Sequence, residues 1–150
     1  MTNRLSRSEL RIWVTLISGM KSFLGALDRQ LRDDFGISHD DYRILAWLSR
    51  AGENGAGMSE LARTMGFSPS RLTHAIQRFE SEGWVIRMTT RRDRRVVEVG
   101  LTERGAQWVD EVSAGHLATV KTLLFDTIGI DGARHMADLM REVGQVARGS

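Results

Sequence analysis

Apolar residues recur at intervals of three and four between residues 6 and 34, the spacing that gathers side chains on one face of an α-helix. This stripe consists of Trp13, Ile17, Met20, Leu24, Leu27 and Leu31. A second apolar set, Leu10, Ile12, Leu16 and Phe23, widens the surface. A helix that is apolar on more than one side has to be covered on more than one side, so the pattern predicts a long helix that packs against a second subunit.

The segment from residue 38 to residue 83 predicts three shorter helices. Ser38, with Asp41 three residues later, is typical of a capped helix start, and the glycines of segment 51–57 predict a loop. Ser59 is the expected cap of the next helix, and Ser68 before a proline is the start signal of another. Glycines at 66 and 83 are expected to end these two helices. Two short helices joined by a tight turn predict a helix-turn-helix.

A period of two replaces the helical spacing after residue 83. Trp84, Ile86 and Met88 alternate with other residues, as do Val97, Val99 and Leu101. Two such runs joined by a polar segment predict an antiparallel hairpin. Its tip, residues 89–95, holds four arginines around one aspartate. A solvated charge run is the ordinary explanation of such a tip, but its place directly after a helix-turn-helix favours contact with DNA phosphates or a minor groove.

The remainder of the chain predicts two more amphipathic helices. Thr102 is the expected cap of the first, Gly129 breaks the pattern, and Asp131 is the expected cap of the last. The fold class is therefore mainly α with a small β wing, in a single unit over residues 1–150. Residues 38–101 form the winged helix-turn-helix, and residues 6–34 and 102–148 form a helical dimerisation part. A two-fold dimer would set two recognition helices one DNA turn apart, about 34 to 36 Å.

The types of basic residue in the chain are more informative than its net charge. The net charge is only +2, but of the 21 basic residues just Lys21 and Lys121 are lysines. Arginine suits phosphate contacts and narrow minor grooves, although an arginine-rich genome would produce the same total. The chain has no cysteine, which excludes disulfides and thiol-based sensing. No uninterrupted apolar run approaches the ~20 residues needed to cross a bilayer, so no membrane association and a cytoplasmic location are expected.

The second helix of the helix-turn-helix carries polar side chains opposite its apolar stripe. Arginine can pair with guanine, glutamine with adenine, and threonine can meet a thymine methyl group. The expected base contacts are Arg71, Thr73, His74 and Gln77, and the expected phosphate contacts are Ser68, Ser70 and Arg78. Exposed polar helix residues usually bind nothing, and the position on this helix is what favours a role in binding DNA.

These segments together resemble the MarR family of bacterial transcription regulators. The similar strings are MSELARTMG, SPSRLTHAIQRFESEGWVIR, and DRR followed by VVEVGLTERG. The resemblance implies a homodimer on a palindromic operator in double-stranded DNA, most often a repressor, with a short strand near Met58. It also implies that Arg95 enters the minor groove and that Asp93 helps to hold it, with Arg94 between them. Arg91 and Arg92 are expected on phosphates.

The family resemblance further implies a small aromatic or anionic effector in the cleft between the winged part and the dimerisation helices. Trp13, Ile17, His39 and Tyr42 are the residues expected near that cleft, although aromatics at helical spacing more often belong to a core. No cofactor is expected.

Two other hypotheses stay open on the sequence. The hairpin could bind a protein partner, or the chain could be a metal-responsive regulator in which His39 joins Asp40 and Asp41. The second is disfavoured, because one histidine among carboxylates at a helix start is more often a cap. No grouping of serine, histidine and acid and no phosphate-binding glycine loop indicates an enzyme.

Overall fold

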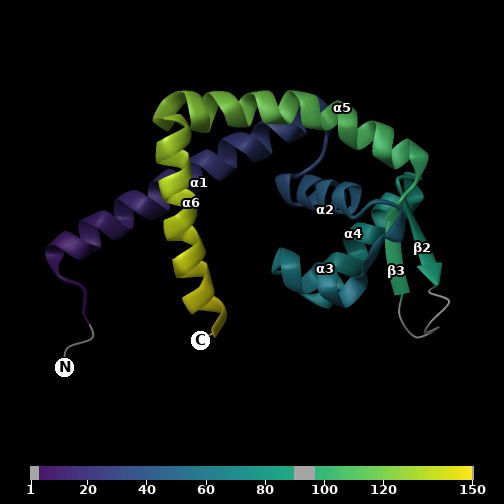
Figure 1. Ribbon diagram of the computed structural model, residues 1–150, viewed down its shortest axis with the longest axis horizontal. Coiled ribbons are helices and arrows are strands. Elements are labelled where there is room, and N and C mark those ends of the chain that lie inside the picture. Colours follow the sequence, from purple (N-terminus) through teal and green to yellow (C-terminus); the bar gives the residue numbers. More distant parts are fainter. Residues whose placement is uncertain (1–3, 90–96, 150) are drawn as a thin grey trace.

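The computed structural model describes residues 4–89 and 97–149. Within these residues, six α-helices and three short strands follow one another (Figure 1). The helices are α1 (Arg7–Phe35), α2 (His39–Ala51), α3 (Met58–Met65), α4 (Pro69–Ser81), α5 (Glu103–Val120) and α6 (Asp126–Gly149). A 3₁₀ turn occupies Gly52–Asn54, and a π-helical turn, Lys121–Phe125, joins α5 to α6. The strands are β1 (Ala56–Gly57), β2 (Val85–Thr89) and β3 (Val97–Leu101).

The three strands form one antiparallel sheet in the order β1-β3-β2. Val85 pairs with Leu101 at the base of the hairpin, and Ala56 pairs with Val99. The expected hairpin is confirmed, and β1 ends directly before Met58, where a short strand was expected. The predicted mainly helical winged fold is also confirmed.

Helix α1 begins and ends on the signals that its sequence carries. Ser6 and Glu9 form a reciprocal capping box, and Gly36 closes the helix in the left-handed region at φ 71°. The prediction for α3 is wrong in one respect. This helix starts at Met58 with Gly57 as its N-cap, so Ser59 already lies inside the first turn. Because Gly57 is itself the last paired residue of β1, the sheet fixes where α3 starts.

The C-terminal helices differ from the expected pair at their junction. The expected break at Gly129 is present, with non-helical φ 69° and ψ 170°. However, α-helical geometry already gives way at Lys121 to the π-helical turn, which the sequence pattern did not predict. The Lys121 ammonium donates to the Asp126 carboxylate across this turn at 2.6 Å. Asp131, the expected cap, accepts a bond from the guanidinium of Arg134.

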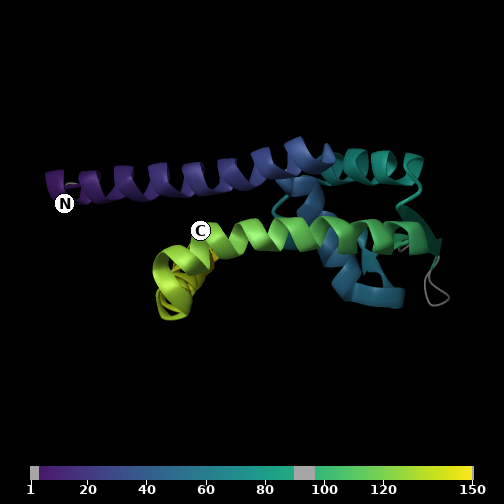
Figure 2. The same cartoon turned by 90° about the horizontal axis from the view of Figure 1, so that it is seen from above.

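Two hydrophobic clusters meet at a pair of tryptophans. The larger cluster combines α2, α3, α4, the sheet and Val109 of α5, and the smaller one holds Leu31, Ile37, Tyr42 and Val112. The rings of Trp84 and Trp108 stack with centroids 4.1 Å apart, and both pack against both clusters. The winged part is therefore continuous with the ends of α1 and α5, while α1 and α6 extend beyond it (Figures 1 and 2).

Large apolar side chains are exposed along α1 and α6. On α1 they are Leu10, Ile12, Trp13, Val14, Leu16, Met20 and Leu24, and on α6 they are Ile128, Ile130, Met136, Leu139, Met140, Val143 and Val146. By length and composition alone α1 is also long and apolar enough to cross a membrane, since it contains an 18-residue window of mean hydropathy 1.2. The uninterrupted apolar runs within it are shorter, as the sequence indicated, because Arg11 and Lys21 divide them.

Gly105 lies in the first turn of α5 with its Cα against the backbone of Trp84. A Cβ at this position would lie 2.0 Å from the Trp84 carbonyl oxygen. We expect Gly105→Ala to lower the free energy of unfolding by about 2 to 3 kcal/mol, as overpacking does elsewhere. Gly115→Ala is the matched control in the same helix, because its Cβ would meet only the Phe35 ring at 3.4 Å. This control should gain about 0.5 to 1 kcal/mol. Denaturant unfolding measures both, and similar changes in the two variants would contradict the account.

Candidate nucleic-acid interface

The position of helix α4 is fixed by its buried apolar face and by the cap at its N-terminus. Leu72, Ala75, Ile76 and Phe79 are buried, which turns the opposite face to solvent. The Ser68 hydroxyl accepts the Arg71 backbone N–H at 3.3 Å, and Pro69 occupies the first turn. Both sequence signals for this helix are confirmed. It ends at Ser81, and Gly83, at φ 73°, turns the chain into β2.

The structure separates the predicted contact residues of α4 into two groups. Ser70, His74 and Gln77 are exposed on the face opposite the core, and Thr73 is half-buried beside them. The Thr73 hydroxyl donates to the Pro69 carbonyl at 2.9 Å. These four side chains form what we call the open face of α4. Side-chain donors and acceptors on this face are what base edges in a major groove require.

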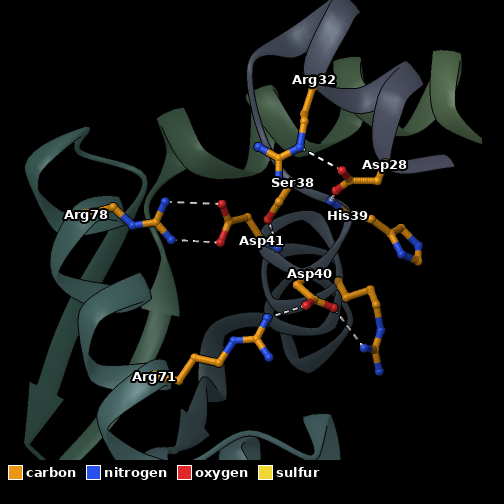
Figure 3. Close-up of polar contacts among 9 residues, drawn as sticks. Asp28, Arg32, Ser38, His39, Asp40, Asp41, Arg71 and Arg78 are labelled. Atoms are coloured by element: carbon orange, nitrogen blue, oxygen red, sulfur yellow. Dashed lines mark hydrogen bonds and ion pairs between the residues drawn. The ribbon is translucent and has the colours of Figure 1, made fainter. Parts of the chain in front are cut away.

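Arg71 and Arg78 form the second group, because both guanidinium groups bond to the first turn of α2 (Figure 3). Arg78 binds the Asp41 carboxylate in a bidentate manner, at 2.9 and 3.2 Å. Arg71 donates to Asp40 and lies over the Phe67 ring, 4.1 Å from its centroid. The sequence assigned both arginines to DNA and did not predict these partners. Asp40 and Asp41 lie 31 and 37 residues away, and no local pattern could show the pairing.

The first turn of α2 is fixed from two further directions. The Ser38 hydroxyl accepts the Asp41 N–H at 3.0 Å, as expected of a cap, while the Asp41 carboxylate turns to Arg78 instead of completing a box. The His39 N–H donates to the Asp28 carboxylate of α1 at 2.9 Å. The side-chain bond from Arg32 and then this backbone bond hold the pKa of Asp28 below its usual range.

Three rings gather on the α1 and α5 side of this turn. The His116 ring lies 4.5 Å from that of Tyr42 and 5.6 Å from that of His39, between centroids. His116 Nδ1 is 3.0 Å from the Gln30 side-chain oxygen, and the Tyr42 hydroxyl is 3.1 Å from that of Ser113. Sequence reasoning did not place His116 here, although a histidine among the apolar positions of α5 was a usable signal.

The predicted effector residues are only partly brought together. His39 and Tyr42 share the ring cluster, but Trp13 and Ile17 lie about 16 to 22 Å further along α1 than Asp28, at 1.5 Å per residue. Within one subunit these four residues therefore do not line one site, because a straight helix separates them.

The tip of the hairpin carries the remaining predicted contacts. Arg91, Arg92, Asp93, Arg94 and Arg95 lie outside the described residues. At the base of the hairpin, Arg87 of β2 donates to the Glu80 carboxylate of α4 at 3.0 and 3.1 Å. This pair fixes the hairpin base against the helix.

A metal site at the start of α2 finds no support in the side-chain directions. The carboxylates of Asp40 and Asp41 point to arginines, while the His39 ring lies on the other side of the turn (Figure 3). Among residues 4–89 and 97–149, no three histidine or carboxylate side chains are grouped to hold an ion.

The Asp41–Arg78 pair should contribute more to stability than the Asp40–Arg71 pair. The Asp41 side chain is 12% exposed and that of Asp40 is 37% exposed. We expect Asp41→Asn to lower the free energy of unfolding by about 1 to 2 kcal/mol. The loss is not larger because water around the exposed Arg78 guanidinium weakens the ion pair. Asp40→Asn should cost less than about 1 kcal/mol. Urea unfolding measures the two values, and equal losses would show that burial of Asp41 has no bearing on stability.

The ring cluster predicts that acid destabilises the protein. Burial first, and then the positive charge of Arg43, lower the pKa of His39, while burial and then His39 lower that of His116. Both groups therefore bind protons more readily when unfolded, and stability should fall as the pH drops below about 6.5. The melting temperature should decline from about pH 7 to pH 5, and less so in His39→Asn. A His39→Asn curve as steep as wild type would contradict this.

Comparison with known proteins identifies the family. The MarR family model matches residues 37–97. The HTH-type transcriptional regulator PecS of Dickeya dadantii is 31% identical over 126 residues, covering 81% of this chain and 76% of that protein. The crystal structure of AbsC, a MarR family transcriptional regulator from Streptomyces coelicolor, has a TM-score of 0.91 at 29% identity and covers 99% of this chain and 100% of that one.

A second MarR family transcriptional regulator from Streptomyces coelicolor was crystallised in complex with DNA. It has a TM-score of 0.90 at 30% identity over 97% of this chain and 91% of that one. The fold, the strings around α3 and α4, and these similarities together show that the chain belongs to the MarR family of DNA-binding transcriptional regulators.

Proposed function

We propose that the protein is a homodimeric, sequence-specific repressor that binds a palindromic operator in the cytoplasm and is released by a small aromatic or anionic ligand. The observation that carries this proposal is the open face of α4, a polar face on a helix whose other side is fully buried. A regulator 30% identical over nearly the whole chain, and crystallised with DNA, supports the same function.

Each proposed DNA contact is assigned to a base or to a phosphate by the chemistry of its side chain. Gln77 suits adenine, His74 can donate or accept, and the Thr73 methyl group suits thymine. Ser70, near the positive end of α4, suits a phosphate, whereas Ser68 is already used as the cap and contributes mainly by fixing the helix. In the wing, Arg95 is assigned to the minor groove and Asp93 to its orientation. Arg91 and Arg92 are assigned to phosphates, and Arg94 lies between Asp93 and Arg95 in the sequence.

The second subunit is needed to cover α1 and α6. Trp13 is 52% exposed and Ile130 is 60% exposed, and both lie among other apolar side chains on their helices. Surfaces of this kind mark interfaces in proteins. A protein partner accounts for the exposed faces of both helices, whereas a membrane would explain only α1, which has the required length and hydropathy. We therefore assign these faces to a two-fold dimer.

The effector part of the proposal rests on His39 and Tyr42, whose rings lie where α1, α2 and α5 meet. Aromatic stacking and a histidine donor suit a ligand that is itself aromatic or anionic. Trp13 and Ile17 would reach the same ligand only from the second subunit, because both are far along α1 from His39.

Gel shift with the intergenic DNA upstream of the gene tests the proposal. We expect the wild type to bind this DNA with two subunits per duplex by light scattering, and a phenolic carboxylate to release it. Gln77→Ala should weaken operator binding by about 1 to 3 kcal/mol per half-site and leave random DNA unaffected. A monomer at micromolar concentration would contradict the dimer. Failure to bind any duplex would favour the protein-interaction module, and dependence on added metal would favour the metal-responsive regulator.

A further inference from the structure

Arg71 stands on the part of α4 that should come closest to base edges, yet its guanidinium is already bound within the protein. The N-terminal residues of a recognition helix are those that reach the bases. Arg71 lies in the first turn of α4, directly after Ser68, Pro69 and Ser70. Its guanidinium donates to Asp40, so in the free protein it is directed toward the first turn of α2 (Figure 3).

Two contacts hold the guanidinium in this position. The Asp40 carboxylate accepts from Nη2, and the Phe67 ring lies under the guanidinium plane at 4.1 Å. Asp40 also accepts from Arg43 at 3.3 Å, so one carboxylate serves two arginines. A carboxylate that accepts from Arg71 occupies the same donors that a phosphate or the O6 and N7 atoms of guanine would use.

This ion pair is held weakly enough to exchange. The side chains of Arg71 and Asp40 are 56% and 37% exposed, and pairs of that kind are commonly worth less than about 1 kcal/mol. The neighbouring pair is different in kind, because the Asp41 carboxylate is largely buried and binds Arg78 through two bonds. Asp41 thus fixes α4 against α2, while Asp40 controls the availability of a single side chain.

We propose that Asp40 is a positioning residue that holds Arg71 on α2 and competes with DNA for it. On random DNA a phosphate offers Arg71 no more than Asp40 does, so the arginine stays on α2 and adds nothing to non-specific affinity. On the operator, a bidentate contact with guanine exceeds the internal pair, so Arg71 moves to the base and gives up the energy of that pair. This inference rests on the proposed function and adds a residue outside the helix-turn-helix to the control of DNA affinity.

The test is Asp40→Asn, which keeps the side-chain shape and removes the competing charge. Binding is measured on the upstream intergenic DNA and on a random duplex of equal length. We expect random-duplex affinity to rise about two- to fivefold per subunit, the range of an exposed ion pair, and operator affinity to rise at least as much, because Arg71 gives up the whole ion pair when it moves to guanine. The ratio of operator affinity to random-duplex affinity should therefore stay the same or rise. The log-log salt slope on random DNA should steepen by about one per subunit, as one more arginine reaches a phosphate.

Three further variants attribute the effect to Arg71. Asp33→Asn is the charge-matched control, since Asp33 is exposed on α1 and makes no ion pair in the part of the chain that the structure describes. In an Arg71→Ala background, Asp40→Asn should have no more effect than this control. In an Arg43→Gln background the full effect should persist, because Arg43 shares Asp40 but lies on α2. Thermal unfolding checks that each variant is folded.

The outcomes are distinct. Asp40→Asn that weakens operator binding, or changes both duplexes as Asp33→Asn does, overturns the proposal and leaves the regulator function intact. An Asp40→Asn effect that survives in the Arg71→Ala background also overturns it. A wild-type protein that binds neither duplex refutes the proposed function itself.

Discussion

The packing of Trp84 is the interaction on which the arrangement of the winged part and the long helices depends. Its ring stacks on Trp108 and contacts Phe79, so it lies where the two hydrophobic clusters meet. Its carbonyl oxygen accepts the Thr102 N–H at 3.0 Å and excludes any side chain at Gly105. Helix α5 therefore starts at a fixed place relative to α4 and the sheet, and the open face of α4 is rigidly joined to this long helix.

The first turn of α2 provides a second connection of the same kind, made of charges instead of rings. Asp28 of α1 holds its backbone, Asp41 holds Arg78 of α4, and the His39 ring faces His116 of α5. Four helices thus meet at one turn of backbone. In the proposed regulator, a ligand or a proton at the ring cluster acts within one or two residues of the carboxylates that hold the recognition helix. This proximity gives effector binding a short physical route to operator affinity.

Several arginines of this chain are paired with carboxylates, and its net charge is only +2. Carboxylate partners lie beside Arg32, Arg43, Arg71, Arg78 and Arg87, so a count of basic residues overstates the charge that is free to meet phosphate. In the proposed regulator, these internal carboxylates limit non-specific attraction and leave the side chains on the open face of α4 to read the sequence. Selectivity then depends on contact geometry more than on total charge.

The sequence by itself determined most of the helices and the hairpin, because capping residues, glycines and apolar spacing act within a few residues of one another. The family followed from the resemblance of strings such as MSELARTMG and VVEVGLTERG. Ser68 and Pro69 set the start of α4, and Gly36 set the end of α1, from local chemistry alone. Only the tertiary structure decided that both arginines of α4 are paired with carboxylates. Asp40 and Asp41 meet Arg71 and Arg78 across more than 30 residues of chain, through the packing of α2 on α4. Helix packing also brings His116 next to His39 and Tyr42, whereas the length of α1 keeps Trp13 far from them. The spacing of residues along a helix shows which side chains share a face, but only the packing of the helices decides which side chains of other helices they contact.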